Sequence, residues 1–341
     1  MEILLGKTNG SDLKIWTASD ADNGHILETG RSGSGKTYAM QILEERIANE
    51  GGCVVVLDYN GTHSNVRKSG QIQRIEIYKK GLPFSLLTPL TLLDGSFERE
   101  MDIMEAVVDV FHTVAPLQSK QRMALREAVL MAITDKSGKE KDEFRRIMAA
   151  LKELEDSSAE SVLDKFFPIF SGVRVWSQNR FSLEKGKIQL FDLNGYSPYV
   201  QRLLAELIIA VIWRWRRVKR DGADCPVYIV CDEFQLLSLK RDSVLSQILR
   251  EGRKFHVSLL LATQTLETFD RGEKAMLQQA ATHLYFRPAE GEIKSIIRYL
   301  GAEDTEGTKK ILQSLACGES LASGRLRVGN ITVEKHLKIK F

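Results

Sequence analysis

The stretch ETGRSGSGKTYAM (28–40) decides the fold of this chain, because residues 30–37 read G-x-x-x-x-G-K-T. The apolar run before the loop predicts a strand, and the apolar spacing after it predicts a helix that stops at a glycine pair. Glycines let successive backbone N–H groups point at phosphate oxygens, and the helix N-terminus adds partial positive charge. The pattern predicts a phosphate-binding loop. Its order, G-x-x-G-x-G followed by Lys-Thr, argues against a dinucleotide-binding fingerprint.

We call residues 30–37 the Walker A loop, and its pattern predicts which residues bind ATP and Mg²⁺. We expect Lys36 to reach the β- and γ-phosphates of ATP and Thr37 to ligate Mg²⁺. The loop alone does not distinguish a switch, a small-molecule kinase and a motor. The expected ATP-binding positions in the loop are Gly30, Arg31, Ser32, Gly33, Ser34, Gly35, Lys36 and Thr37.

A second motif, VYIVCDEF, ends an apolar strand in two carboxylates, Asp232 and Glu233. We expect Asp232 to hold Mg²⁺ through water and Glu233 to accept a proton from the attacking water. Acids at a strand end also occur simply for solvation, but here they accompany a phosphate-binding loop. Because kinases and GTP switches usually lack the second acid, Glu233 favours an ATP-hydrolysing enzyme. We call this pair the Walker B acids.

Three further features are candidates for the site, and each has a plainer alternative. Gln264 ends the strand LLLATQT, where it would sense the γ-phosphate or simply solvate a strand end. Arg250 and Arg253 in LREGRKF would stabilise the transferring phosphoryl group across a subunit boundary, or merely complement a helix dipole. Asp58 ends the strand CVVVLD and would face the nucleotide or form an Asx-type turn.

The chain alternates strand-like and helix-like segments around these motifs, which is typical of an α/β fold with a mostly parallel sheet. One long segment has helical period only, and it interrupts this alternation. The sequence therefore predicts a short N-terminal β segment, an ATPase core in two pieces and an inserted helical subdomain. The predicted ranges are 1–25 for the β segment, 26–95 and 171–341 for the core, and 96–170 for the insertion.

Composition excludes several classes of protein. The net charge of +3 argues against a histone-like basic protein, although it allows a local basic channel. The four cysteines form no C-x-x-C pair and are predicted to be reduced thiols in a cytoplasmic protein. The histidines show no metal-ligand spacing, so we expect no zinc site. We expect neither a signal peptide nor a membrane span, since the longest apolar segment, LLAELIIAVIW, is short and contains an acid.

The order of the motifs resembles the HerA-type ATPases of the HerA/FtsK superfamily, over about residues 25–325. The block REGRKF…LLLATQ is the most specific part, because generic P-loop proteins lack it. The chain departs from the family at Thr62, where the Asp-x-x-Gly-Glu turn usually has Glu, and in its short N-terminal segment, where longer relatives have a β-barrel. The segments that carry the resemblance are GRSGSGKT, VVVLDYNGTHS, IQLFDLNG, VYIVCDEFQLL, ILREGRKFHVSLLLATQT and CGESLASG.

The resemblance implies a RecA-like core that assembles as a hexameric ring, hydrolyses ATP between subunits, and translocates or unwinds duplex DNA. It also implies a nuclease partner, in DNA processing or defence against phage. Two alternatives stay open: an ATP-organised ring scaffold that activates an effector nuclease, and a secretion- or conjugation-type ATPase. Basic residues after strand ends are candidates for the DNA-lined pore: Arg67, Lys68, Lys240 and Arg241.

Overall fold

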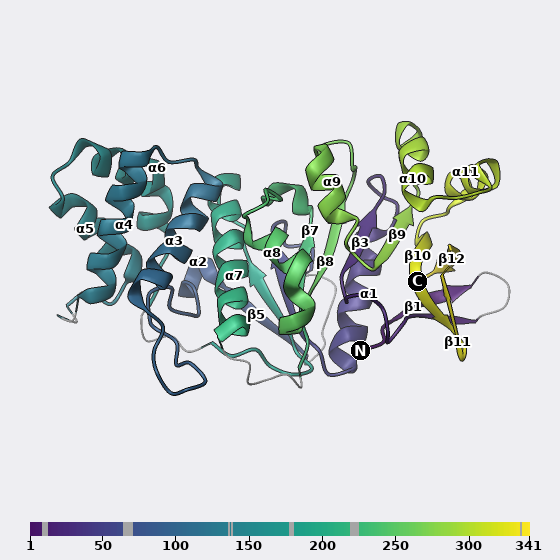
Figure 1. The fold of residues 1–341 in the computed structure, drawn as a ribbon, viewed down its shortest axis with the longest axis horizontal. Coiled ribbons are helices and arrows are strands. Elements are labelled where there is room, and N and C mark those ends of the chain that lie inside the picture. Colours follow the sequence, from purple (N-terminus) through teal and green to yellow (C-terminus); the bar gives the residue numbers. More distant parts are fainter. Residues whose placement is uncertain are drawn as a thin grey trace.

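The computed structural model describes residues 1–8, 13–63, 71–135, 137, 139–176, 181–218, 225–334 and 336–341. The molecule is elongated, with a group of helices at one end, a sheet with helices against it in the middle, and short antiparallel strands at the other end (Figure 1). Both chain termini lie toward the antiparallel end (Figure 1).

A twelve-stranded sheet runs through the described residues, and its central part is parallel. These strands are runs of β-branched and aliphatic residues buried on both faces, as parallel sheets require. The predicted α/β fold with a mostly parallel sheet is confirmed. In spatial order the parallel strands are β9 (Thr282–Phe286), β3 (Ile26–Thr29), β8 (Val257–Thr263), β7 (Val227–Asp232), β4 (Cys53–Asp58), β6 (Ile188–Asp192) and β5 (Ile72–Glu76).

Helices cover both faces of this parallel part. Alternate side chains of a strand point to opposite faces, so Val54 and Val56 pack in one core with α1, while Val55 and Leu57 pack in another with α7 and α8. The result is a three-layer arrangement, in which α1 lies on one side of the sheet and α7 on the other. The helices are α1 (Lys36–Asn49), α7 (Pro198–Val218) and α8 (Val244–Glu251).

The first and last strands of the chain pair with each other at the antiparallel end. β1 pairs with β12, and β2 pairs with β10, which also joins the parallel part through β9. The N-terminal strands are thus bonded into the same sheet as the ATPase strands. The elements at this end are β1 (Leu4–Thr8), β2 (Lys14–Thr17), α10 (Ile293–Leu300), α11 (Thr305–Ser314), β10 (Glu319–Val328), β11 (Ile331–Glu334) and β12 (Leu337–Lys340).

Four helices pack together at the opposite end around a core of phenylalanines. The sequence predicted a helical segment in this region without distinguishing α6, which contains Pro168, as a separate helix. Its N-cap, Asp156, accepts a hydrogen bond from the Ser158 backbone N–H at 3.1 Å. The helices are α3 (Glu100–Val114), α4 (Ser119–Thr134), α5 (Glu143–Glu153) and α6 (Ser157–Gly172), and two short helices elsewhere are α2 (Ile77–Lys80) and α9 (Arg271–Leu277).

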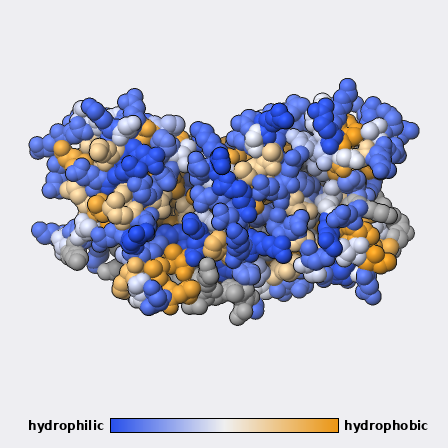
Figure 2. All heavy atoms as spheres, viewed as in Figure 1, coloured by the Kyte–Doolittle hydropathy of each residue, from blue (hydrophilic) through white to orange (hydrophobic). Residues whose placement is uncertain are grey.

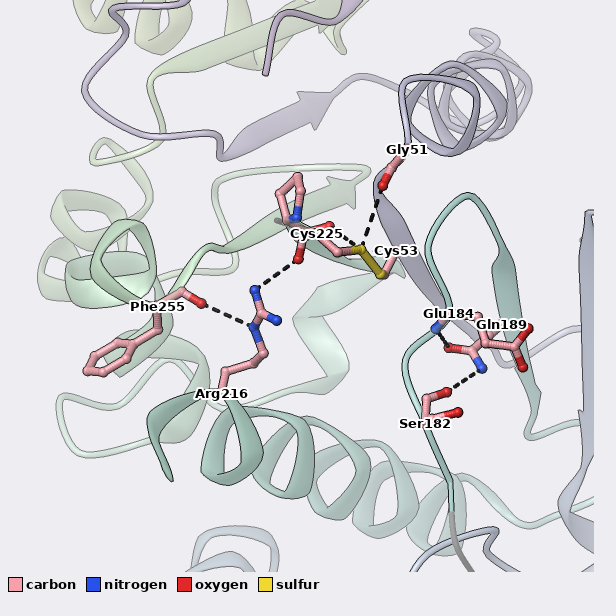
Figure 3. The surroundings of a disulfide bond; sticks show 9 residues. Gly51, Cys53, Ser182, Glu184, Gln189, Arg216, Cys225 and Phe255 are labelled. Atoms are coloured by element: carbon pink, nitrogen blue, oxygen red, sulfur yellow. Dashed lines mark hydrogen bonds between the residues drawn. A yellow bond between two sulfur atoms is a disulfide. The ribbon is translucent and has the colours of Figure 1, made fainter. Parts of the chain in front are cut away.

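The prediction that all cysteines are reduced was wrong for one pair, because Cys53 and Cys225 form a disulfide (Figure 3). Cys53 begins β4 and pairs with Val227 of β7, so Cys225 lies beside it with a Cα–Cα distance of 6.2 Å. The two are 172 residues apart in sequence, and no local spacing could have revealed them. Cys231 is a buried free thiol and Cys317 an exposed one.

The face shown in Figure 2 is largely hydrophilic, with an apolar patch over the loop between α2 and α3. In that loop Leu93 and Phe97 are 61% and 67% exposed. Within the part of the chain that the structure describes, we find no helix with the length and apolar character needed to cross a bilayer.

Candidate functional site

The predicted motifs meet at one edge of the sheet because their strands end side by side. Thr29 at the end of β3 is opposite Thr263 of β8, and Asp232 at the end of β7 is opposite Ala262 of β8. The Walker A loop, the Walker B acids and Gln264 all follow these strand ends. Carboxyl ends of parallel strands are where α/β sheets bind their ligands.

The Walker A loop is fixed by neighbouring backbone. Gly35 has φ of 99°, and a Cβ there would lie 2.6 Å from the Gly318 backbone nitrogen. The Gly318 N–H donates to the Ser34 carbonyl at 3.0 Å, and the Arg31 N–H donates to the Arg287 carbonyl at 3.0 Å. The late CGES segment and the end of β9 therefore form the wall of the loop, and only glycine fits at position 35.

The N-terminus of α1 is open to an anion. Its N-cap is Gly35, and no described side chain caps it, so its first backbone N–H groups are available to phosphate oxygens. The Lys36 ammonium donates to the Gly30 carbonyl at 2.6 Å and to the Arg31 carbonyl at 3.2 Å. Burial lowers the pKa of Lys36, and the nearby Asp232 and Glu28 carboxylates oppose that effect.

Thr37 and Asp232 lie in direct contact, with the Thr37 hydroxyl donating to Asp232 Oδ2 at 2.8 Å. Hydroxyl and carboxylate oxygens beside phosphate are the ligands with which proteins hold Mg²⁺. The donor set of this pair therefore fits the metal that the motif implies.

Glu233 and Gln264 are also brought together, since the Gln264 amide donates to Glu233 Oε1 at 3.3 Å. Glu233 has a left-handed backbone with φ of 61°, which residues other than glycine seldom adopt. Such conformations cluster at functional sites, where surrounding contacts hold them. The arrangement places a carboxylate and an amide beside the predicted phosphate and metal positions.

Arg250 and Arg253 are not part of this cluster. Both are exposed and lie just before β8 begins at Val257, at the sheet edge opposite the Walker A loop. Arg253 donates to the Asp22 carbonyl at 3.0 Å. The seven residues of β8 separate the two edges by about 20 Å. Neither arginine can contact phosphate in its own chain, so a role requires a neighbouring subunit.

Two other predictions have mixed outcomes. Asp58 is 1% exposed, and its carboxylate accepts the Thr62 backbone N–H at 3.1 Å, which is the turn arrangement, while contact with a nucleotide stays a prediction. Lys240 and Arg241 are exposed, whereas Arg67 and Lys68 lie outside the described residues.

The sequence reading missed an ionisable group under the loop. Glu28 in β3 is fully buried, and its carboxylate oxygens have no hydrogen-bond partner among the described residues. Burial, followed by the Asp232 charge, raises the pKa of Glu28 well above its usual value. The sequence could have revealed Glu28, because it is an acidic residue inside the apolar strand HILET.

Nearby on α1, Glu44 Oε1 lies 3.1 Å from His63 Nδ1. Burial alone would lower the pKa of His63, but Glu44 raises it.

Glu292 was missed as well. It is 4% exposed and accepts the Leu266 backbone N–H at 2.8 Å and the Thr265 hydroxyl at 2.5 Å. It therefore fixes the segment that directly follows Gln264. Nothing in the sequence distinguished it from other acids in surface helices.

Comparison with known proteins agrees with this geometry. The family model described as "Helicase HerA, central domain" matches residues 3–212. The chain is 22% identical over 351 residues to the DNA double-strand break repair helicase HerA of Saccharolobus solfataricus, covering 95% of this chain and 66% of that protein. It is 20% identical to the protein of the same name from Sulfurisphaera tokodaii, covering 95% and 67%. The chain thus spans about two thirds of the length of these relatives.

Solved structures show the same fold at low identity. VirB4 of Thermoanaerobacter pseudethanolicus is similar with a TM-score of 0.72 and 17% identity, covering 99% of this chain and 96% of that one. The plasmid coupling protein TrwB, in complex with an ATP analogue, has a TM-score of 0.69 and 14% identity, covering 100% and 93%. The RecA-like fold is therefore confirmed. With the family model matching well over half of its length, this chain belongs to the HerA family of P-loop ATPases.

Proposed function

We propose that this protein is a hexameric, cytoplasmic ATPase motor that translocates along or unwinds duplex DNA, with a nuclease partner in DNA processing or phage defence. The observation that carries the proposal is the meeting of Thr37 with Asp232 and of Gln264 with Glu233 at one sheet edge. Membership of the HerA family supports it, and so do relatives named as DNA double-strand break repair helicases.

The geometry supports a specific division of labour in ATP hydrolysis. Backbone N–H groups of the Walker A loop hold the phosphates, and Lys36 exchanges its carbonyl partners for phosphate oxygens. Thr37 and Asp232 would hold Mg²⁺, and the ion would supply positive charge to the phosphates. Glu233 accepts the proton of the attacking water, and Gln264 orients Glu233 and that water. A pure nucleotide-binding scaffold does not need this base.

The small net charge of the chain indicates how it would contact DNA. A net charge of +3 is too small for a surface coated in basic residues, so contacts must be concentrated at a few positions. A ring concentrates them by bringing copies of one loop around a common axis. Lys240 and Arg241 are exposed in the loop that follows the Walker B acids. We propose that they contact phosphates, which makes binding salt-sensitive and independent of sequence.

The decisive experiment measures the ATPase rate with and without long duplex DNA at low salt, alone and with a candidate nuclease partner. We expect stimulation by DNA that disappears as salt rises. Glu233→Gln should retain ATP binding and lose turnover by about 100-fold or more, as removal of a general base does. Lys36→Ala should weaken ATP binding itself.

Other results would reject parts of the proposal. Full turnover in Glu233→Gln would show that another group is the base. ATP hydrolysis without DNA binding or stimulation, with or without a partner, would replace the motor by an ATP-organised scaffold.

A further inference from the structure

Helix α7 holds three loops at the catalytic edge with only two side chains. The Gln201 amide donates to the carbonyls of Tyr59 and Leu193, at 3.0 and 3.1 Å. The Glu206 carboxylate accepts the Ser238 backbone N–H at 2.8 Å. These partners follow β4, β6 and β7 respectively. One helix thus sets the positions of loops that come from three different strands.

The loop after β7 is the one that carries Glu233. It continues through a 3₁₀ turn (Phe234–Leu236) to Ser238. Phe234 is fully buried and stacks on Phe269 at 5.2 Å between ring centroids. The loop is therefore fixed at Phe234 by packing and at Ser238 by Glu206. Because Glu233 lies between β7 and these two points in a left-handed conformation, its orientation depends on both.

Burial of the Glu206 side chain at this position is energetically unfavourable by itself. It is 1% exposed on a helix whose neighbouring buried positions are Leu203, Leu207 and Ile209. Burying a carboxylate costs free energy unless it is hydrogen-bonded. Solvation of a helix surface does not explain this residue, whereas the bond to the Walker B loop does.

The far end of α7 is anchored independently. Arg214 pairs with Glu98 at 2.5 Å and donates to the carbonyls of Leu86 and Thr88, in the segment that leads into α3. α7 is thus a support fixed at both ends. Glu206 also lies at the wall of a cavity of about 940 Å³ between α3, α7 and α8.

We propose that Glu206 is a positioning residue for ATP hydrolysis, which holds the Ser238 end of the Walker B loop and thereby orients Glu233. This inference rests on the proposed ATPase function. Glu206 does not contact the Walker A loop in any hydrogen bond between described residues. Loss of its acceptor should therefore slow turnover and spare ATP binding.

The test compares kcat and KM for ATP in the full-length wild type, Glu206→Met and Glu206→Gln. Methionine keeps the shape and removes the acceptor, while glutamine keeps an oxygen for the Ser238 N–H. We expect Glu206→Met to lose about 10- to 100-fold in kcat with KM within about twofold, as a small misplacement of a catalytic group does. Glu206→Gln should stay within about threefold of the wild type in kcat.

Asp142 supplies a control, because its buried carboxylate also accepts backbone N–H groups, from Phe144 at 3.2 Å and Val175 at 3.3 Å, outside the segment that anchors α7. Asp142→Leu should lower stability and leave kcat of the folded protein unchanged. In a Glu233→Gln background, Glu206→Met should cause no further loss, because residues acting through one group are not additive.

Several outcomes overturn the inference. They are wild-type kcat in Glu206→Met, an equal loss in Asp142→Leu, or additive losses with Glu233→Gln. Should Glu206→Met fail to fold, Glu206→Ala is measured in its place with the same expectation. A wild-type protein without any ATPase activity rejects the proposed function, whereas an active wild type with an indifferent Glu206 rejects only the positioning role.

Discussion

At the scale of single residues, His25 shows how the strand before the Walker A loop depends on a neutral side chain. His25 is 1% exposed, and its Nδ1 accepts the Leu259 backbone N–H at 3.0 Å. Nδ1 can accept only when the ring is neutral. Burial accordingly lowers the pKa of His25 to about 4. This bond links the start of β3 to β8, the two strands whose far ends carry the Walker A loop and Gln264.

The free energy of unfolding should therefore decrease as the pH is lowered, because protonation of His25 is unfavourable in the folded protein. The unfolded chain binds a proton to His25 near pH 6.5, while the folded chain binds it only near pH 4. The contribution is fully present above pH 6.5 and is lost as pH falls toward 4. Between pH 7 and pH 5 the loss is about 2 kcal/mol.

The measurement is the free energy of unfolding at pH 7 and pH 5 for the wild type and His25→Asn, whose side-chain oxygen can replace Nδ1 as acceptor. The pH-dependent loss should shrink by about 2 kcal/mol in the variant. His336→Asn, at an exposed position, should leave it unchanged. An identical pH dependence in wild type and His25→Asn would show that His25 titrates normally in the folded protein.

At the scale of elements, the sequence predicted best where a strand or helix has a strong pattern of its own. β3, α1, β7 and β8 follow from apolar runs, glycines and terminal acids, and each appears where expected. α6 was not recognised as a separate helix because Pro168 interrupts its helical pattern, and its buried residues pack against α3, α4 and α5. β5 was missed because it is a partly exposed edge strand with little apolar content.

The site shows the same division. The residues of the Walker A loop and the Walker B acids are local in sequence, so a short pattern was enough to predict them. Gly318, Glu206 and Glu292 act through backbone contacts with segments far away in the chain. Such contacts depend on the final packing of the fold, and a single sequence contains no periodic signal for them.

The disulfide gives a prediction at this scale, because it joins the first residue of β4 to the segment that leads into the neighbouring strand β7. Purified, unreduced and then unfolded protein should present two reactive thiols per chain, Cys231 and Cys317. Reduction should release four and lower the melting temperature. Closing a loop with a sequence separation of 172 residues contributes about 5 kcal/mol on the chain-entropy model.

Thiol titration and thermal unfolding check this prediction together. Cys225→Ser should melt at the temperature of the reduced wild type, and reductant should not lower it further. Cys317→Ser, at the exposed free cysteine, should keep the wild-type response to reductant. Four reactive thiols in unreduced protein would show that no disulfide forms and that sheet hydrogen bonds and packing alone hold β4 beside β7.

At the scale of the whole molecule, the two edges of the parallel sheet carry different parts of the predicted machinery. The Walker A loop, the Walker B acids and Gln264 lie at the carboxyl edge, and Arg250 and Arg253 lie at the opposite edge. A head-to-tail ring can present the second edge of one subunit to the first edge of the next. If the arginines take part in hydrolysis, they act on a neighbour.

Mixed assemblies test this arrangement. Arg253→Ala keeps an intact Walker A loop, and Lys36→Ala keeps intact arginines, so each variant alone should have little ATPase activity. In a random equal mixture, about one quarter of the subunit boundaries combine a wild-type loop with a wild-type arginine, since both halves are drawn independently. We expect the mixture to recover up to about that fraction of wild-type activity, and the same for Arg250→Ala if that residue is the one in contact.

A mixture of Lys36→Ala with Glu233→Gln is the matched control, because both changes affect the same side of the boundary and no complete site can form. Equal activity in the two mixtures, or a strictly monomeric protein in ATP and Mg²⁺, would contradict action across a boundary.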